Sequence, residues 1–154
     1  MNEYQSRFEP IDDDYSTCDR TDATLAIYHV DPDLITHKLG LKPTSCMKKG
    51  VPNIMPSGVE RIGRINNWML SSENEVKSKD LRRHLDWVLD RIEPVSKQLL
   101  ELQKLPEVRM VLHCSWWGGA PGGAGPMFWP IHIERMAKLN VEVWFRFGTE
   151  EDDE

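Results

Sequence analysis

Two stretches of the chain place a proline-started helix directly after an alternating strand, and this order restricts the folds open to it. Residues 24–30, TLAIYHV, alternate as in a half-buried strand. After them, Asp31 suits the helix N-cap, Pro32 the first helical position and Gly40 the left-handed residue after the helix. The sequence therefore predicts a strand–helix unit over residues 24–40.

The same order returns near the C-terminus. Residues 108–117, VRMVLHCSWW, alternate as a strand, and the glycine-rich loop 118–126 leads to a helix that starts at Pro130. Asn140 can supply the left-handed end of that helix, and residues 141–147, VEVWFRF, form the last predicted strand. The helix is expected to bury Ile133, Met136 and Ala137.

Between these units lie one more strand and a pair of helices. Residues 64–71, RINNWMLS, are the predicted strand, and a helix opening near Ser78 carries a continuous apolar stripe. Pro94 breaks or kinks this helix, and a second helical piece runs to about Leu105. Residues 42–64 contain three prolines and three glycines without a period, which predicts a loop with room for a short extended piece.

The element order β-α-β-α(α)-β-α-β predicts an α+β fold. Two βαβ halves would form a four-stranded antiparallel sheet with helices on one face, which is the ferredoxin-like (split βαβ) plan. An extra helix pair, residues 78–105, joins the two halves. The sequence leaves open which face of the sheet this pair covers.

The net charge of −6 over 154 residues is unevenly spread. Residues 1–22 carry seven acids against two bases, residues 149–154 carry five acids, and residues 23–148 hold 17 bases against 13 acids. This pattern predicts a single α+β domain at 23–148 between two acidic tails, of which the N-terminal one is flexible. Acidic tails favour a basic partner through electrostatic attraction.

Cysteine usage and hydropathy indicate a cytoplasmic protein. Cys18, Cys46 and Cys114 are an odd number without a CxxC pair, which argues against a disulfide framework. The first residues show no apolar signal-peptide stretch, and no apolar run approaches the roughly 20 residues of a membrane span.

The chain also carries a series of motifs in a characteristic order. They are TLAIYHVDPDLITHKLGLKPT, KKG, NWMLSS, LRRHLDWVLDRIEP, HCSWWGGAPGGAGP and VEVWF. Over about residues 22–147 this order resembles the bacterial domain-of-unknown-function family 4279. Trp129 departs from the pattern, since a small capping residue is expected before Pro130. The resemblance implies no established activity and no catalytic residues; it implies a small bacterial cytosolic protein of the kind encoded beside toxins as an antidote.

The alternation also predicts which side chains point away from the helices. The first and third strands are central in the predicted sheet, so their outward residues should cluster with those of the last strand. Tryptophan, tyrosine and arginine on one face are typical of binding hot spots. The alternative is that the linking helices or a second subunit cover this face. The predicted binding face comprises Tyr28, His113, Ser115, Trp117, Trp144 and Arg146.

The glycine-rich loop offers a second candidate site. Backbone N–H groups between a strand and a helix start can hold an anion. The loop fits neither the P-loop nor the dinucleotide fingerprint, and a flexible turn is the simpler interpretation. An anionic ligand would be framed by Lys48, Lys49, Gly118, Gly119, Gly122 and Gly123.

No catalytic or metal-binding arrangement is evident in the sequence. His113 and Cys114 are neighbours on a strand and point to opposite faces, and the other histidines lack ligand spacing. His84 is expected on the wet side of its helix. Because the glycine-aromatic RNA-binding pattern is missing, we expect no specific nucleic-acid partner, and we expect no cofactor, metal or membrane partner.

These observations favour a non-enzymatic cytosolic binding protein that recognises another protein, with a toxin-neutralising immunity-type factor as its narrower form. The alternative is a small anionic-ligand sensor or enzyme that uses residues 118–126 with Lys48 and Lys49. A homodimer that buries the sheet face is a third hypothesis.

Overall fold

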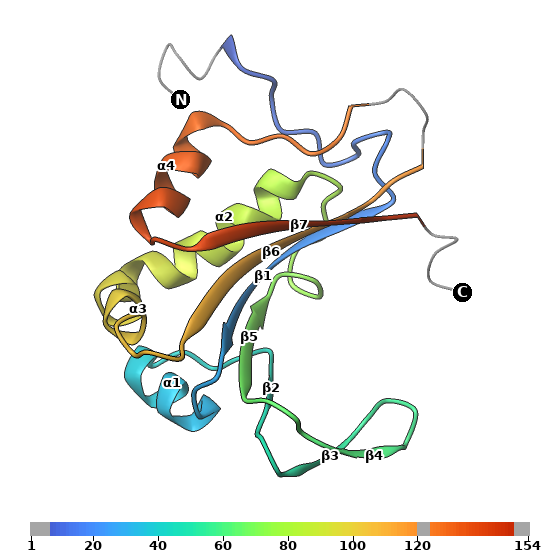
Figure 1. The fold of residues 1–154 in the computed structure, drawn as a ribbon. Helices are drawn as coiled ribbons and strands as arrows, with labels where there is room; N and C mark the ends of the chain where they lie inside the picture. Colours follow the sequence, from blue (N-terminus) through green and yellow to red (C-terminus); the bar gives the residue numbers. More distant parts are fainter. Residues whose placement is uncertain (1–6, 120–123, 150–154) are drawn as a thin grey trace.

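The computed structural model describes residues 7–119 and 124–149. Its strands are β1 (Arg20–Tyr28), β2 (Ser45–Met47), β3 (Pro52–Ile54), β4 (Glu60–Ile62), β5 (Asn67–Ser71), β6 (Arg109–Trp117) and β7 (Glu142–Gly148). Its helices are α1 (Pro32–Leu39), α2 (Leu81–Ile92), α3 (Ser96–Leu102) and α4 (Pro130–Lys138), with a 3₁₀ turn at Glu93–Val95. Five strands form one sheet in the order β2-β5-β1-β6-β7, while β3 and β4 form a separate hairpin (Figure 1).

Strand pairing confirms the α+β class but not the ferredoxin-like plan. β1 is antiparallel to both β5 and β6, whereas β6 and β7 are parallel. The crossover through α4 therefore returns the chain to the strand directly beside β6, as in a simple βαβ unit. The predicted four-stranded antiparallel sheet is corrected in this respect, and also in its size, because β2 adds a fifth strand beside β5.

The four α-helices pack on the same face of the sheet (Figure 1). The helix pair α2–α3, whose side the sequence left open, contributes to the same apolar core as α1 and α4. The inward side chains of β1, β5 and β6 supply the other half of this core. Its fully buried members include Leu25, Ile27, Ile35, Trp68, Leu85, Leu89, Ile92, Leu99 and Leu112.

Helix ends follow the local signals in the sequence. The Asp31 carboxylate caps α1 by accepting a hydrogen bond from the N–H of Asp33 at 2.9 Å. Gly40 adopts the left-handed conformation with φ of 65°, and its N–H donates to the carbonyl of Thr36. Asn140 follows α4 in the same region, with φ of 53°. Both predicted helix ends are confirmed.

Residues 42–64, predicted as a loop, hold three short strands. β2 lies beside β5, and the β3–β4 hairpin projects from the body (Figure 1). Each of these strands has three residues, and Gly58 turns the hairpin with φ of 83°. Strands of three residues cover only one and a half periods of the two-residue alternation, which is too little for the pattern to place them individually. Ile54 and Ile62 on the hairpin are 81% and 65% exposed.

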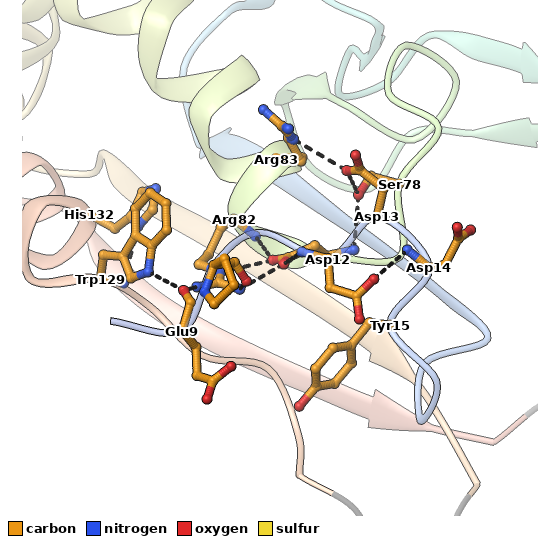
Figure 2. A network of polar contacts seen from close by, with 12 residues as sticks. Glu9, Asp12, Asp13, Asp14, Tyr15, Ser78, Arg82, Arg83, Trp129 and His132 are labelled. Atoms are coloured by element: carbon orange, nitrogen blue, oxygen red, sulfur yellow. Dashed lines mark hydrogen bonds and ion pairs between the residues drawn. The ribbon is translucent and has the colours of Figure 1, made fainter. Parts of the chain in front are cut away.

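The N-terminal segment lies against the domain instead of extending as a flexible tail. Residues 20–22 are the start of β1. Before them, the backbone is bound by Arg82, a side chain only 1% exposed. Its guanidinium donates to the carbonyl of Glu9 at 2.6 Å and to that of Pro10 at 2.9 Å (Figure 2). The tail prediction is therefore corrected from residue 9 onward; residues 1–6 and 150–154 lie outside the described residues.

Asp80 completes this network at the start of α2. Its carboxylate accepts hydrogen bonds from the Arg82 guanidinium at 2.8 and 3.0 Å and from the N–H of Asp12 at 2.8 Å. Burial opposes ionisation of Asp80, but these hydrogen bonds hold its pKa below the usual value. The buried pair therefore stays charged and fixes the N-terminal segment on α2.

Trp129, the departure from the family pattern, belongs to the same network. Its indole N–H donates to the Glu9 carbonyl at 2.8 Å, and the Arg82 guanidinium lies 5.0 Å from its ring centre (Figure 2). The indole of Trp129 has no oxygen that could accept from the N–H groups of the first turn, and the His132 ring binds the N–H of Trp129 itself, which Nδ1 accepts at 3.2 Å. The large ring before Pro130 thus binds the N-terminal segment instead of capping α4.

α4 is rotated relative to the prediction. It buries His132 and Met136, whereas Ile133 is 56% exposed and Ala137 is also exposed. Ion pairs explain this orientation of α4, because the Arg135 side chain extends to α2 and to the 3₁₀ turn after it. Its guanidinium binds Asp86, Asp90 and Glu93. These ion pairs orient a helix whose apolar pattern alone favoured a different face.

Candidate functional site

The sheet face opposite the helices gathers the candidate site residues. Successive strand residues point to opposite faces, so the inward positions of β1, β6 and β7 set the outward ones. No helix in the described part of the chain packs on this side. The outward polar and aromatic residues, here called the open face, are Arg20, Asp22, Thr24, Tyr28, Arg109, His113, Ser115, Trp117, Glu142, Trp144 and Arg146, while Ala26 and Val111 are buried beneath them. All six side chains predicted for the binding face lie on it.

A cluster of rings joins the three strands at the middle of the open face. The Tyr28 hydroxyl lies 3.1 Å from Nε2 of His113, and the His113 ring meets the Trp144 ring edge-on, with centroids 6.1 Å apart. The Arg109 guanidinium lies 4.4 Å from the centre of the Trp144 ring and 3.6 Å from the Glu142 carboxylate. Trp144 is therefore held in place although 46% of it is exposed.

Trp117, the last residue of β6, forms a second cluster on the open face. Guanidinium groups lie over its ring, that of Arg20 at 4.2 Å and that of Arg146 at 5.9 Å from the centroid. The indole is consequently only 9% exposed. At this end of the open face the arginine side chains are exposed to solvent, whereas the sequence predicted an exposed tryptophan. Ser115, two residues before Trp117 on the same face of β6, is also buried, with 7% of its surface exposed.

Electrostatics make the open face basic near neutral pH. Burial lowers the pKa of His113, and Arg109 and Arg146 act in the same direction, so the imidazole is neutral at pH 7. Burial raises the pKa of Asp22 to about 6, and the neighbouring Glu73 carboxylate adds to the shift. At pH 7 a carboxyl with this pKa is still mostly ionised, so the face is basic because its three arginines outnumber its two carboxylates.

The second predicted site is not assembled. Lys48 and Lys49 follow β2 and lie near Asn67, which pairs with the last residue of β1. Gly118 follows Trp117, which pairs with the first residue of β1. The two ends of this nine-residue strand are about 27 Å apart at a rise of about 3.4 Å per residue. One small ligand cannot span that distance.

The described glycines of the loop also differ from an anion cradle. A Cβ on Gly118 would lie 2.2 Å from the Thr17 carbonyl oxygen and 2.3 Å from the Trp116 ring, so this glycine serves close packing. Gly119 has open space around it. Gly122 and Gly123 lie outside the described residues.

A buried serine–histidine pair replaces the surface histidine expected on α2. His84 is 1% exposed, with Nδ1 2.7 Å from the Ser72 hydroxyl and Nε2 2.8 Å from the Ser78 carbonyl. Ser72 is fully buried and also accepts from the N–H of Ala23. Burial lowers the pKa of His84. A hydroxyl sealed from solvent cannot meet a substrate, so the pair joins α2 to the sheet.

The two buried thiols are poor nucleophiles. Burial raises the pKa of the Cys18 thiol to about 11 and that of Cys114 to about 12, which suppresses the nucleophilic thiolate. Within residues 7–119 and 124–149, His, Cys, Asp and Glu side chains form no group of three suited to a metal ion. None of the helices described has the length and apolar character to cross a bilayer.

Two arginines of the open face are not among the residues predicted for it. Arg20 lies in the segment predicted as a tail, so strand alternation does not place it opposite Trp117, where the structure has it in β1. Arg109 could have been found, because it alternates in phase with His113 and Trp117 along the predicted strand.

Fold and site together define a class: an α+β protein whose mostly antiparallel sheet carries helices on one face and braced aromatic and arginine side chains on the other. The chain belongs to the family described as Domain of unknown function (DUF4279), whose sequence model matches residues 18–148. The family resemblance of the motifs is thereby confirmed. No curated protein and no solved structure matches the chain.

Proposed function

We propose that the chain is a non-enzymatic binding protein that recognises another protein through its open face. The observation that carries this proposal is Trp144, which is exposed yet held between His113 and Arg109 on a face that none of the described helices covers. Tryptophan, tyrosine and arginine supply most hot-spot residues of protein interfaces. Side chains that are already held lose little conformational entropy on binding, which favours affinity.

The charges of the face favour a partner surface that carries carboxylates. Arg20, Arg109 and Arg146 outnumber the carboxylates of Asp22 and Glu142. Guanidinium groups bind carboxylates in bidentate geometry, which adds specificity. The expectation of a basic partner rested on the acidic tails and stays a prediction for those segments.

A toxin-neutralising role in the bacterial cytoplasm is the narrower form of this proposal. It rests on the family resemblance and on three free cysteines, Cys18, Cys46 and Cys114, which suit a reducing compartment. The small-ligand alternative has less support, because its lysines and Gly118 lie at opposite ends of β1.

Affinity capture from lysate of the source cells with matched baits tests the proposal. The face variant is Arg20→Ala with Arg109→Ala. The control is Arg91→Ala, whose guanidinium lies 3.7 Å over the Trp87 ring on α2, away from the open face. Wild type and control should retain one acidic protein in equal molar amount, and the face variant about tenfold less. Equal capture by all three baits, or no protein retained, would contradict the proposal.

A further inference from the structure

β7 is a long and exposed edge of the sheet. The opposite edge, β2, has three residues, whereas β7 has seven, and among the described residues no strand pairs with its outer side. Its side chains are exposed on both faces: Trp144 by 46%, Phe145 by 48% and Phe147 by 63%. Natural sheets protect such edges with charges, bulges or very short strands, because an open edge pairs readily with another strand.

The backbone of β7 has a regular row of groups turned outward. The N–H of Gly118 donates to the carbonyl of Gly148 at 3.1 Å, so residues in phase with Gly148 direct their backbone groups to β6. Val143, Phe145 and Phe147 are out of phase with Gly148. Their N–H and C=O groups therefore point to the free side.

We propose that a second copy of the chain occupies this edge, with the two β7 strands antiparallel about a two-fold axis at Trp144. In this register Glu142 lies opposite Arg146 of the second copy, and Arg146 opposite its Glu142. A two-fold axis requires a self-complementary surface, and these two charge pairs provide it on the open face. Shifting the register by two residues places Glu142 opposite Gly148 or Trp144 and loses both charge pairs.

The helix-side face of the strand fits the same register. Val143 lies opposite Phe145 of the second copy, and Val141 opposite its Phe147, so apolar side chains meet apolar side chains. The Phe145 ring is already ordered between Phe128 and Phe147, with centroids 5.7 Å away on each side. Pairing would join two five-stranded sheets and set their open faces side by side.

Charge exchange tests the register. Sedimentation equilibrium of the full chain should show a concentration-dependent species of twice 17.9 kDa. Glu142→Arg and Arg146→Glu should each weaken self-association by about tenfold, because both pairs become repulsive. An equimolar mixture of the two variants should associate within about threefold of wild type, since the opposite charges again meet. A monomer at all concentrations, or a dimer that neither substitution weakens, overturns the proposal.

A proline variant tests the backbone pairing separately. Phe145→Pro removes one outward N–H without touching the hydrogen bonds to β6, a change that edge strands tolerate. It should weaken self-association by about tenfold or more, while Phe145→Val, which keeps the N–H, should have a smaller effect. Equal association of the two variants, each checked for unchanged circular dichroism, overturns the edge assignment. The Arg20→Ala, Arg109→Ala bait should remain dimeric, so failure here is distinguishable from failure of partner capture.

Discussion

The Arg109 guanidinium lies 4.4 Å from the centre of the Trp144 ring, so a residue of β6 supports an exposed ring on the edge strand β7. The same arrangement recurs at Trp117, where Arg20 lies 4.2 Å from the ring centre. Cation–π contacts of this kind contribute about 0.5–1 kcal/mol at exposed sites. They keep large aromatic side chains ordered on a surface that no described helix covers, and such order is what a binding face needs.

Replacing Asp22 by asparagine should stabilise the protein at neutral pH. Burial, and then the Glu73 carboxylate, raise the pKa of Asp22 to about 6 from 3.8. Between these values the folded state binds more protons than the unfolded state, so the contribution of Asp22 to stability falls as pH rises through that window. After a discount for solvent screening, the expected gain in unfolding free energy is about 1–2 kcal/mol.

Urea unfolding of wild type and Asp22→Asn at about pH 4 and pH 7 measures this effect. The gain should be present at pH 7 and nearly absent at pH 4. His84 and His113, with pKa values lowered by burial, give the opposite slope on acidification, but they act in both proteins and cancel in the difference. The same difference at both pH values would show that Asp22 does not titrate in this way.

Arg82→Met should be strongly destabilising. It leaves the Asp80 carboxylate, 5% exposed, without its ion pair and frees the carbonyls of Glu9 and Pro10. Breaking a buried pair from one side costs about 3–5 kcal/mol. Arg83→Met is the matched control, because its pair with Asp13 is about half exposed on both sides. Denaturant unfolding should show a loss below about 1 kcal/mol for the control.

The same variants report on the N-terminal segment. With Arg82 removed, protease cleavage before β1 should become faster than in wild type, because the segment loses its backbone anchors. Unchanged cleavage and a small loss of stability in Arg82→Met would mean that the network does not hold the segment.

Gly118→Ala should destabilise the end of β6. A Cβ at this position would lie 2.2 Å from the Thr17 carbonyl oxygen and 2.3 Å from the Trp116 ring, so backbone or ring must shift. Overpacking of this kind costs about 1–3 kcal/mol. Gly119→Ala, with nothing within 4 Å of the added carbon, should be nearly neutral. Thermal unfolding of the two variants measures this difference. Equal melting temperatures would mean that the chain around Gly118 adjusts to the added carbon without loss of stability.

The sequence correctly predicted helix ends and strand faces that depend on residues close together in the chain. Asp31 and Gly40 bound α1 as their side-chain and backbone preferences dictate, and the alternation of β6 correctly separates Leu112 from His113. Pro94 correctly marked the break between α2 and α3, which the structure forms as a 3₁₀ turn. The open face could be predicted for the same reason, because its membership follows from strand phase alone.

Long-range polar contacts were not predictable in this way. Arg82 holds the backbone of Glu9, 73 residues earlier, and no periodic pattern records such a bond. Arg135 rotates α4 through ion pairs with α2, which exposes Ile133 against its apolar pattern. The parallel placement of β7 depends on which edge of the sheet is free, and this is a property of the assembled sheet.

The most direct measurement of partner binding is site-specific photo-crosslinking in the source cells. A photoreactive phenylalanine replaces Tyr28, half-buried on the open face, or Trp87, half-buried on α2. If the open face binds a protein, the probe at position 28 should yield one discrete adduct with an acidic protein, and the probe at position 87 should yield none. Identical adducts from both positions, or none from position 28 in a protein that folds normally, would contradict the account.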